Sequence, residues 1–146
     1  MYVIDASVLV ADIRPSDPHH EAAHAFLQGV RDRGCPVYLP AIVLPEIAAA
    51  ISRGTGDSVL ARRFVALIQR IPHFEIVSVD EALGHLAAAL AARHAVRGCD
   101  AVYVALAEAR GARLITLDHQ QRERVPGGIP AQSPAEALSN VGCTGA

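Results

Sequence analysis

The stretch Leu114-Ile115-Thr116-Leu117-Asp118 is a nearly continuous apolar run that ends in a carboxylate. A short run this apolar is typical of a strand that is covered on both faces, as the strands of a parallel sheet are. The N-terminus repeats the pattern in Val3-Ile4-Asp5. Because ligands bind at the carboxyl ends of the strands in an open parallel sheet, we expect Asp5 and Asp118 to meet in one crevice.

The rest of the chain alternates strand-like runs with helical segments, which is the pattern of an α/β domain with a parallel sheet. We expect strands near residues 2–5, 37–39, 74–79, 113–117 and 129–132. We expect helices near residues 18–33, 44–53, 57–71, 81–96, 100–110 and 134–139. A chain of 146 residues forms one domain. We place this domain at residues 1–139 and expect residues 140–146 to be a disordered tail.

Local capping signals mark the expected starts of two helices. Asp17-Pro18 offers a capping side chain followed by proline at the first helical position. Ser133-Pro134-Ala135-Glu136 fits a capping box, in which the serine and the glutamate each bond the backbone N–H of the other. We therefore expect helices to begin at Pro18 and at Pro134.

The charge balance and the absence of lysine exclude several classes of function. The net charge is -2, so binding to nucleic acid must depend on local arginines and not on a global basic field. All 13 basic residues are arginine, which excludes a P-loop lysine and a lysine Schiff base. The candidates for contacts with phosphate are Arg62, Arg63, Arg93, Arg97, Arg122 and Arg124.

Cysteine usage and hydropathy indicate a cytoplasmic protein. The odd number of cysteines, without CxxC spacing, argues against a disulfide framework or a zinc site, so we expect free thiols in a reducing compartment. The cysteines are Cys35, Cys99 and Cys143. The N-terminal apolar run is interrupted by Asp5 and Asp12 and has no basic region before it, so we expect neither a signal peptide nor a membrane span.

Four acidic residues lie where an apolar segment is expected to open onto solvent. They are Asp5, Glu46, Asp100 and Asp118. Three of them also have an ordinary alternative role: Asp5 as an exposed strand-end residue or a helix cap, Glu46 as a partner of the helix macrodipole, and Asp100 as a helix cap. Four carboxylates in one crevice repel, by about 4 kcal/mol for each pair at 4 Å and an effective dielectric of 20, so they need a cation or protons. Because hard oxygen ligands favour Mg²⁺ or Mn²⁺, the sequence predicts a carboxylate metal site.

Four segments of the chain resemble, in order and spacing, the PIN-domain ribonucleases, and most closely the VapC-type toxins of prokaryotic toxin-antitoxin pairs. The segments are Val3-Ile4-Asp5-Ala6-Ser7, Leu44-Pro45-Glu46, Asp100-Ala101-Val102-Tyr103-Val104-Ala105-Leu106-Ala107 and Leu114-Ile115-Thr116-Leu117-Asp118. The resemblance covers residues 2 to about 137. It implies a single PIN-like α/β domain whose five-stranded parallel sheet, of order 3-2-1-4-5, is flanked by helices.

The resemblance also implies chemistry, ligands and partners. Asp5, Glu46, Asp100 and Asp118 would be the catalytic and metal-binding acids, with Ser7 and Thr116 as supporting polar groups. A bound Mg²⁺ or Mn²⁺ would lower the pKa of a water for in-line attack on RNA, leaving a 5′-phosphate. The implied partners are RNA and a cognate antitoxin protein, and we also expect a homodimer. Only three Phe and three Tyr are present, which favours structured RNA over single strands stacked on aromatic rings.

Two other functions fit parts of this pattern. A phosphoryl-accepting receiver domain is also a five-stranded α/β fold with an acidic pocket, but it needs an adjacent acidic pair after the first strand and a late lysine. Here alanine follows Asp5 and lysine is absent, which argues strongly against a receiver. A PIN-like module that binds RNA or protein without cleaving remains an alternative, and only an activity measurement separates it from a ribonuclease.

Overall fold

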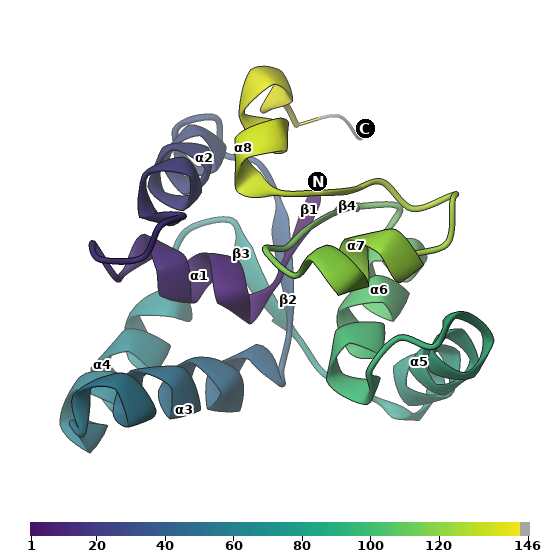
Figure 1. Ribbon diagram of the computed structural model, residues 1–146, viewed down its shortest axis with the longest axis horizontal. Coiled ribbons are helices and arrows are strands. Elements are labelled where there is room, and N and C mark those ends of the chain that lie inside the picture. The colour runs from purple at the N-terminus through teal and green to yellow at the C-terminus, as the bar shows by residue number, and fades with distance from the viewer. Residues whose placement is uncertain (144–146) are drawn as a thin grey trace.

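The computed structural model describes residues 1–143, and a parallel sheet of five strands lies at the centre of the fold (Figure 1). The strands are β1 (Tyr2–Ile4), β2 (Val37–Pro40), β3 (Phe74–Val77), β4 (Arg113–Ile115) and β5 (Ala131–Gln132). Their order in the sheet is β3-β2-β1-β4-β5, and every neighbouring pair is parallel. The predicted fold class and strand order are therefore confirmed.

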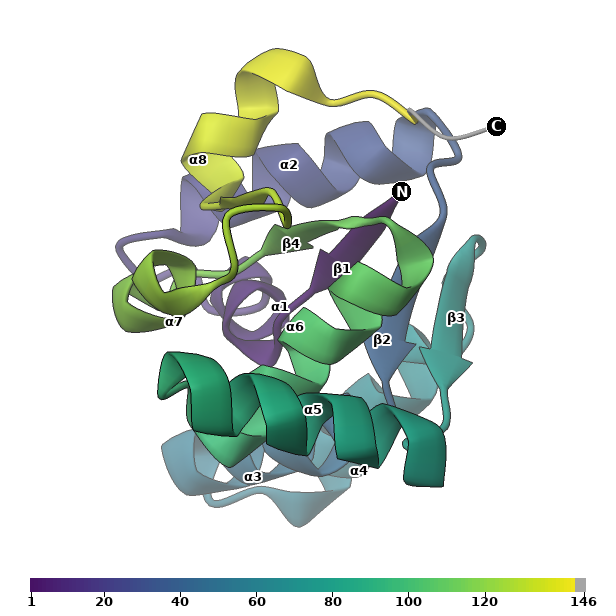
Figure 2. The ribbon, with the colours of Figure 1, turned by 90° about the vertical axis from the view of Figure 1, so that its right-hand side faces the viewer.

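Helices cover both faces of the sheet. They are α1 (Ala6–Asp12), α2 (His20–Asp32), α3 (Val43–Thr55), α4 (Ser58–Ile68), α5 (Glu81–His94), α6 (Gly98–Arg110), α7 (His119–Arg124) and α8 (Pro134–Ala137), followed by the 3-10 turn η1 (Leu138–Asn140). Figure 1 shows α1 to α4 on one side of the sheet and α5 and α6 on the other. In Figure 2, α6 lies between the sheet and the outer helix α5. Within residues 1–143 no helix is both long and apolar enough to cross a membrane.

The central strands explain the apolar runs in the sequence. Every residue of β1 is fully buried, and so are Leu114 and Ile115 of β4, because helices cover both faces of these strands. The chain leaves β1 toward β2 and β3 and then returns to the other side of β1 as β4. The strand order therefore reverses between β1 and β4, which is where an open α/β sheet binds ligands. The backbone N–H of Asp5 donates to Ile115 O at 2.9 Å, so the two strand ends stay paired there.

Two short helices were not expected from the sequence. Helix α1 begins directly after β1, and its residues Ala6, Val8, Leu9 and Ala11 are buried. A helix buried on most of its surface shows no polar face, so its sequence reads like a continuation of the strand. Residues 119–124, which lie outside the helices expected from the sequence, form α7. This helix has no apolar stripe, and its start is fixed by the cap that the Asp118 side chain gives to the N–H of Gln121.

The two capping signals have different outcomes. The Ser133 and Glu136 side chains form the predicted capping box at the start of α8. The prediction of a helix start at Pro18 is wrong, because α2 begins at His20. The carboxylate of Asp17 accepts the N–H of His19 at 2.8 Å and closes a turn before the helix. An aspartate two residues before an N–H supports a turn as readily as a helix start.

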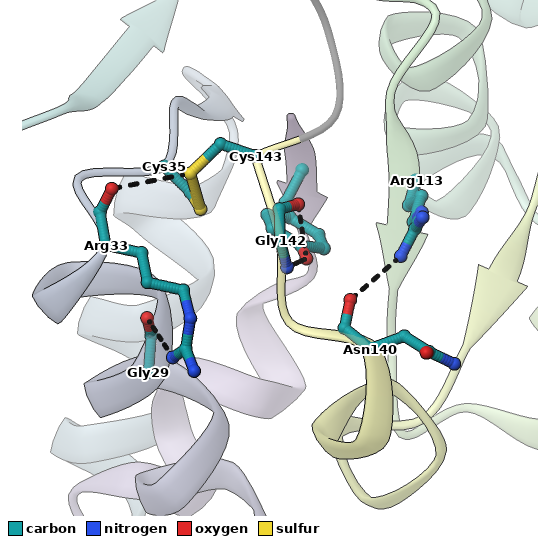
Figure 3. The surroundings of a disulfide bond; sticks show 8 residues. Gly29, Arg33, Cys35, Arg113, Asn140, Gly142 and Cys143 are labelled. Atoms are coloured by element: carbon teal, nitrogen blue, oxygen red, sulfur yellow. Dashed lines mark hydrogen bonds between the residues drawn. A yellow bond between two sulfur atoms is a disulfide. The ribbon is translucent and has the colours of Figure 1, made fainter.

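The C-terminal segment is held against the domain by a disulfide and hydrogen bonds (Figure 3). Cys35 and Cys143 are disulfide-bonded, with 4.9 Å between their Cα atoms. The Tyr2 hydroxyl donates to Gly142 O at 3.1 Å and accepts the N–H of Gly142. Of the tail that was expected to be disordered from residue 140, residues 142 and 143 make these contacts, and residues 144–146 lie outside the described residues.

The expectation of free thiols is wrong for Cys35 and Cys143 and holds for the exposed Cys99. The two bonded cysteines are 108 residues apart in sequence. Helix α8 and turn η1 pack against α2 and lead the chain back to the loop that follows α2, where Cys35 lies. The spacing of the cysteines in the sequence does not show that the chain returns to this loop, so it gave no reason to pair the two residues.

Because the disulfide closes most of the chain into a loop, removing it should destabilise the protein. We expect Cys143→Ser to lower the free energy of unfolding by about 2–4 kcal/mol in urea denaturation without reductant, since the unfolded chain regains the entropy that the bond removes. Cys99→Ser is the matched control and should unfold like the wild type. Equal stability of Cys143→Ser and Cys99→Ser would contradict the disulfide.

Candidate active site: a carboxylate pocket at the strand ends

The four predicted acids line one pocket of about 450 Å³ beside the switch point. Asp5 follows β1, Glu46 lies in the first turn of α3, Asp100 lies in the first turn of α6, and Asp118 caps α7. The other lining residues are Ala6, Ser7, Pro45, Ala49, Arg53 and Arg97. All four carboxylates thus lie at helix N-termini, where the helix macrodipole favours negative charge.

Asp5 is the most buried of these acids, with a relative exposure of 8%. Its Oδ1 accepts the N–H of Ser7 at 2.8 Å and so caps α1. Burial raises the pKa of Asp5, the hydrogen bonds from Ser7 partly oppose this, and the negative charges of Asp100 and Asp118 raise it further. A nearby cation would offset both the burial and the repulsion.

Glu46 is held by a buried tyrosine that sequence reasoning did not identify. The Tyr103 hydroxyl donates to Glu46 Oε2, and Tyr103 is fully buried in α6. Burial raises the pKa of Glu46, the hydrogen bond from Tyr103 lowers it, and the charges of Asp5 and Asp100 raise it again. A signal for this role was present, because Tyr103 follows Asp100 by three residues and so lies on the same helix face.

Arg97 joins the other two acids. Its Nε donates to Asp100 Oδ2 at 2.6 Å, and its Nη2 donates to Asp118 Oδ2. Burial acts to raise the pKa of Asp118, but the N–H of Gln121 and the Arg97 guanidinium outweigh it, so the pKa lies below its ordinary value. Arg97 was predicted as a contact for phosphate, and in this structure it contacts carboxylates.

The supporting residues fix the backbone that carries the acids. Ser7 lines the pocket, and its Oγ accepts the N–H of Leu117 at 3.2 Å. Thr116 is fully buried and does not line the pocket, but its Oγ1 accepts the N–H of Asp118 at 3.1 Å. Both side chains therefore hold the segment that ends in Asp118, although only Ser7 also faces the pocket.

Gln121 ties two of the acidic segments together and was missed in the sequence. It is almost fully buried, its N–H donates to Asp118 Oδ1 at 3.0 Å, and its Nε2 donates to Asp100 O at 3.2 Å. Within the described residues its Oε1 has no hydrogen-bond partner. A glutamine in the polar run His119-Gln120-Gln121-Arg122-Glu123-Arg124 gives no sign that it turns inward.

The remaining arginines take several positions. Arg53, which was not among the predicted contacts, lines the pocket. The guanidinium of Arg122 donates to Thr116 O at 3.1 Å and that of Arg124 donates to Ala95 O at 2.7 Å, so both hold backbone near the site. Arg93 lines a separate hollow of about 560 Å³. Exposed Arg62 and Arg63 lie on α4 and do not line the acidic pocket.

The donor set fits a divalent cation in chemical kind. The pocket offers carboxylate oxygens, which are the ligands that Mg²⁺ and Mn²⁺ prefer. As the side chains are placed, no group of three His, Cys, Asp or Glu residues within 1–143 is arranged to hold one ion. The Arg97 guanidinium instead supplies positive charge between Asp100 and Asp118.

Solved structures with the same fold include toxins and their complexes. VapC20 from Mycobacterium tuberculosis, described as a Sarcin-Ricin loop cleaving toxin, is 19% identical with a TM-score of 0.74, over 89% of this chain and 99% of that one. VapBC2 from Rickettsia felis, bound to promoter DNA, gives 15% identity and a TM-score of 0.70, over 90% and 97% of the two chains. FitAcB from Neisseria gonorrhoeae is 24% identical with a TM-score of 0.69, over 92% of this chain and 98% of that one.

At these identities the similarity to solved structures establishes the fold and nothing more. Comparison with curated proteins gives no match. The sequence itself matches the family model of the PIN domain over residues 2–125, from β1 to the residue that follows α7. That match covers most of the chain and spans all four acids of the pocket. The chain therefore belongs to the PIN domain family.

Proposed function

We propose that this chain is a metal-dependent endoribonuclease and the toxin of a toxin-antitoxin pair. The observation that carries the proposal is the convergence of Asp5, Glu46, Asp100 and Asp118 on one pocket in a PIN-family chain. Support also comes from the structural neighbours, among which VapC20 is described as cleaving the Sarcin-Ricin loop. Cleavage of a structured RNA element agrees with the small number of aromatic residues here.

The acids would hold Mg²⁺ or Mn²⁺, which supplies a water of lowered pKa and neutralises charge that develops on the phosphate. Three of the carboxylates, and the backbone of the fourth acid, have a partner in this chain that fixes their position. The Ser7 N–H orients Asp5, the Tyr103 hydroxyl orients Glu46, and Gln121 holds Asp118 and the backbone of Asp100. Arg53 lines the pocket and would meet a phosphate oxygen of the RNA.

A protein partner is proposed at a second surface, the groove between α1, α2 and α4. Its apolar lining residues are Leu9, Ile13, Leu27, Phe64, Leu67, Ile68, Ile71 and Phe74. Leu67 is 58% exposed, a large value for a leucine beside an apolar groove. An amphipathic antitoxin segment would bury this surface, and a basic residue at its end would meet the acidic pocket.

Only some apolar residues of α2, α3 and α4 line this groove. Phe26, Ile47 and Ile51 are buried in the core. Leu27 is also buried but lines the groove, as do Phe64 and the exposed Leu67. Leu60 is partly buried against the core and does not line it. Association with a second copy of the chain stays a prediction.

Cleavage of RNA should require the metal and the acids. We expect the purified protein to cleave structured RNA with Mg²⁺ or Mn²⁺ and to stop in excess EDTA. Asp5→Asn and Asp100→Asn should each lower the cleavage rate by more than about 100-fold, because each removes a metal ligand. Asp32→Asn, on the exposed end of α2, is the matched control. Full cleavage in EDTA would refute the metal mechanism, and no cleavage by any preparation would favour the binding module.

Asp5→Asn should also stabilise the metal-free protein at neutral pH. The raised pKa means that the folded state prefers Asp5 protonated, so ionised Asp5 costs stability above that pKa. The wild type should therefore regain stability as the pH falls from the raised pKa toward about 3.9, the ordinary value. In thermal melts with EDTA, the excess Tm of Asp5→Asn should be present at pH 7 and shrink over this range. A lower Tm for Asp5→Asn at pH 7 would contradict the electrostatic cost.

The antitoxin proposal predicts a partner whose binding depends on the groove. Co-expression with the product of the neighbouring upstream gene should restore growth and give a complex that co-purifies. Leu67→Asp should weaken that complex about tenfold or more, since it places a charge in an apolar contact. Leu138→Asp is the control, because Leu138 is exposed at 39% and lies away from the groove. Equal binding by the two variants would exclude the groove as the docking surface.

A further inference from the structure

Arg97 pairs with two of the four proposed metal ligands, Asp100 and Asp118. It is the residue that precedes α6, in the short connection from α5. Its guanidinium bonds Asp100 Oδ2 through Nε and Asp118 Oδ2 through Nη2. One side chain therefore spans two acids from different helices, Asp100 in the first turn of α6 and Asp118 at the start of α7.

A metal ion shared by Asp100 and Asp118 would compete with this guanidinium. Both cations bind carboxylate oxygens, and Arg97 occupies one oxygen of each residue. The planar guanidinium presents several donors in a fixed fork, so a single arginine satisfies both carboxylates at once. The other arginine of the pocket, Arg53, makes no ion pair with an acid among the described residues.

Arg97 can turn away without moving the backbone that carries the acids. Its side chain is 64% exposed, so rotation of the side chain alone carries the guanidinium into solvent. The connection that carries it is anchored by the bond from Arg124 Nη1 to Ala95 O at 2.7 Å. Gln121 holds both the Asp118 carboxylate and the Asp100 backbone without help from Arg97.

We propose that Arg97 is an intramolecular counter-ion that competes with the divalent cation for Asp100 and Asp118 and thereby sets the metal affinity of the pocket. This inference rests on the proposed cation site. In the metal-free protein Arg97 neutralises part of the repulsion among the acids. Metal binding displaces the guanidinium, so the measured affinity is the intrinsic affinity reduced by the strength of the Arg97 contacts.

The test is a titration of the full chain with Mn²⁺, followed by calorimetry, for the wild type, Arg97→Gln and Arg53→Gln. Both variants remove one positive charge from the same pocket, so general electrostatics acts on both. Only Arg97→Gln removes the direct contacts. We expect Arg97→Gln to bind Mn²⁺ about three- to thirtyfold more tightly than the wild type, the range that two partly exposed ion pairs allow. Arg53→Gln should show a smaller gain.

Thermal melts give a second readout that does not depend on binding heat. In EDTA the Tm of Arg97→Gln should fall below that of the wild type, because the acids lose their counter-ion. In saturating Mn²⁺ the two Tm values should converge, because the metal has already displaced Arg97.

Equal or weaker Mn²⁺ binding by Arg97→Gln, compared with Arg53→Gln, would overturn the competition while leaving the cation site intact. Absence of Mn²⁺ binding by the wild type and both variants would overturn the proposed cation site as well. Binding by Arg97→Gln alone would support the competition in its strongest form.

Discussion

Repulsion among four carboxylates at one end of the sheet is the constraint on which the rest of this structure depends. The parallel arrangement of β1 and β4 brings Asp5 and Asp118 to the same edge, and the starts of α3 and α6 add Glu46 and Asp100. In a partly dry pocket such charges either raise one another's pKa or attract a cation. Both responses are present. Burial, together with the charges of the neighbouring acids, raises the pKa of Asp5 and of Glu46, and Arg97 pairs with the other two acids. The positive ends of the helix macrodipoles further lower the free-energy cost of holding these negative charges together.

The buried polar residues around the pocket hold this arrangement in place. Tyr103 connects α6 to Glu46 in α3, and Gln121 connects α7 to Asp100 in α6. These bonds cross between elements that are distant in sequence, so the positions of the acids depend on the whole fold. Charges held at fixed positions in this way act on a substrate or an ion without first reorganising, which is how electrostatic catalysis gains its strength.

Features that depend on local sequence patterns could be predicted. Features that depend on contacts between residues distant in sequence could not. The apolar runs before Asp5 and Asp118 identified β1 and β4, because buried parallel strands have no polar face. The strand order, and with it the switch point, was implied by the resemblance to PIN-domain proteins. Helix α1 was not predicted for the same reason: most of its residues are buried, so its sequence resembles a continuation of the apolar strand β1. The disulfide was not predicted, because only the packing of α8 and η1 against α2 brings Cys143 to Cys35. Arg97 was predicted to contact phosphate, because Asp118 is too distant from it in sequence for their contact to be inferred.

We propose that the pocket is a cation site and that Arg97 neutralises part of its charge when metal is absent. Crystals grown with Mn²⁺ and measured for anomalous scattering test it most directly, since Mn²⁺ is located independently of any assumed ligand. We expect an anomalous peak in the pocket at Asp100 and Asp118, with the Arg97 side chain turned away from both carboxylates. A structure at saturating Mn²⁺ with no peak in the pocket, and with Arg97 still bonded to Asp100 and Asp118, would contradict it.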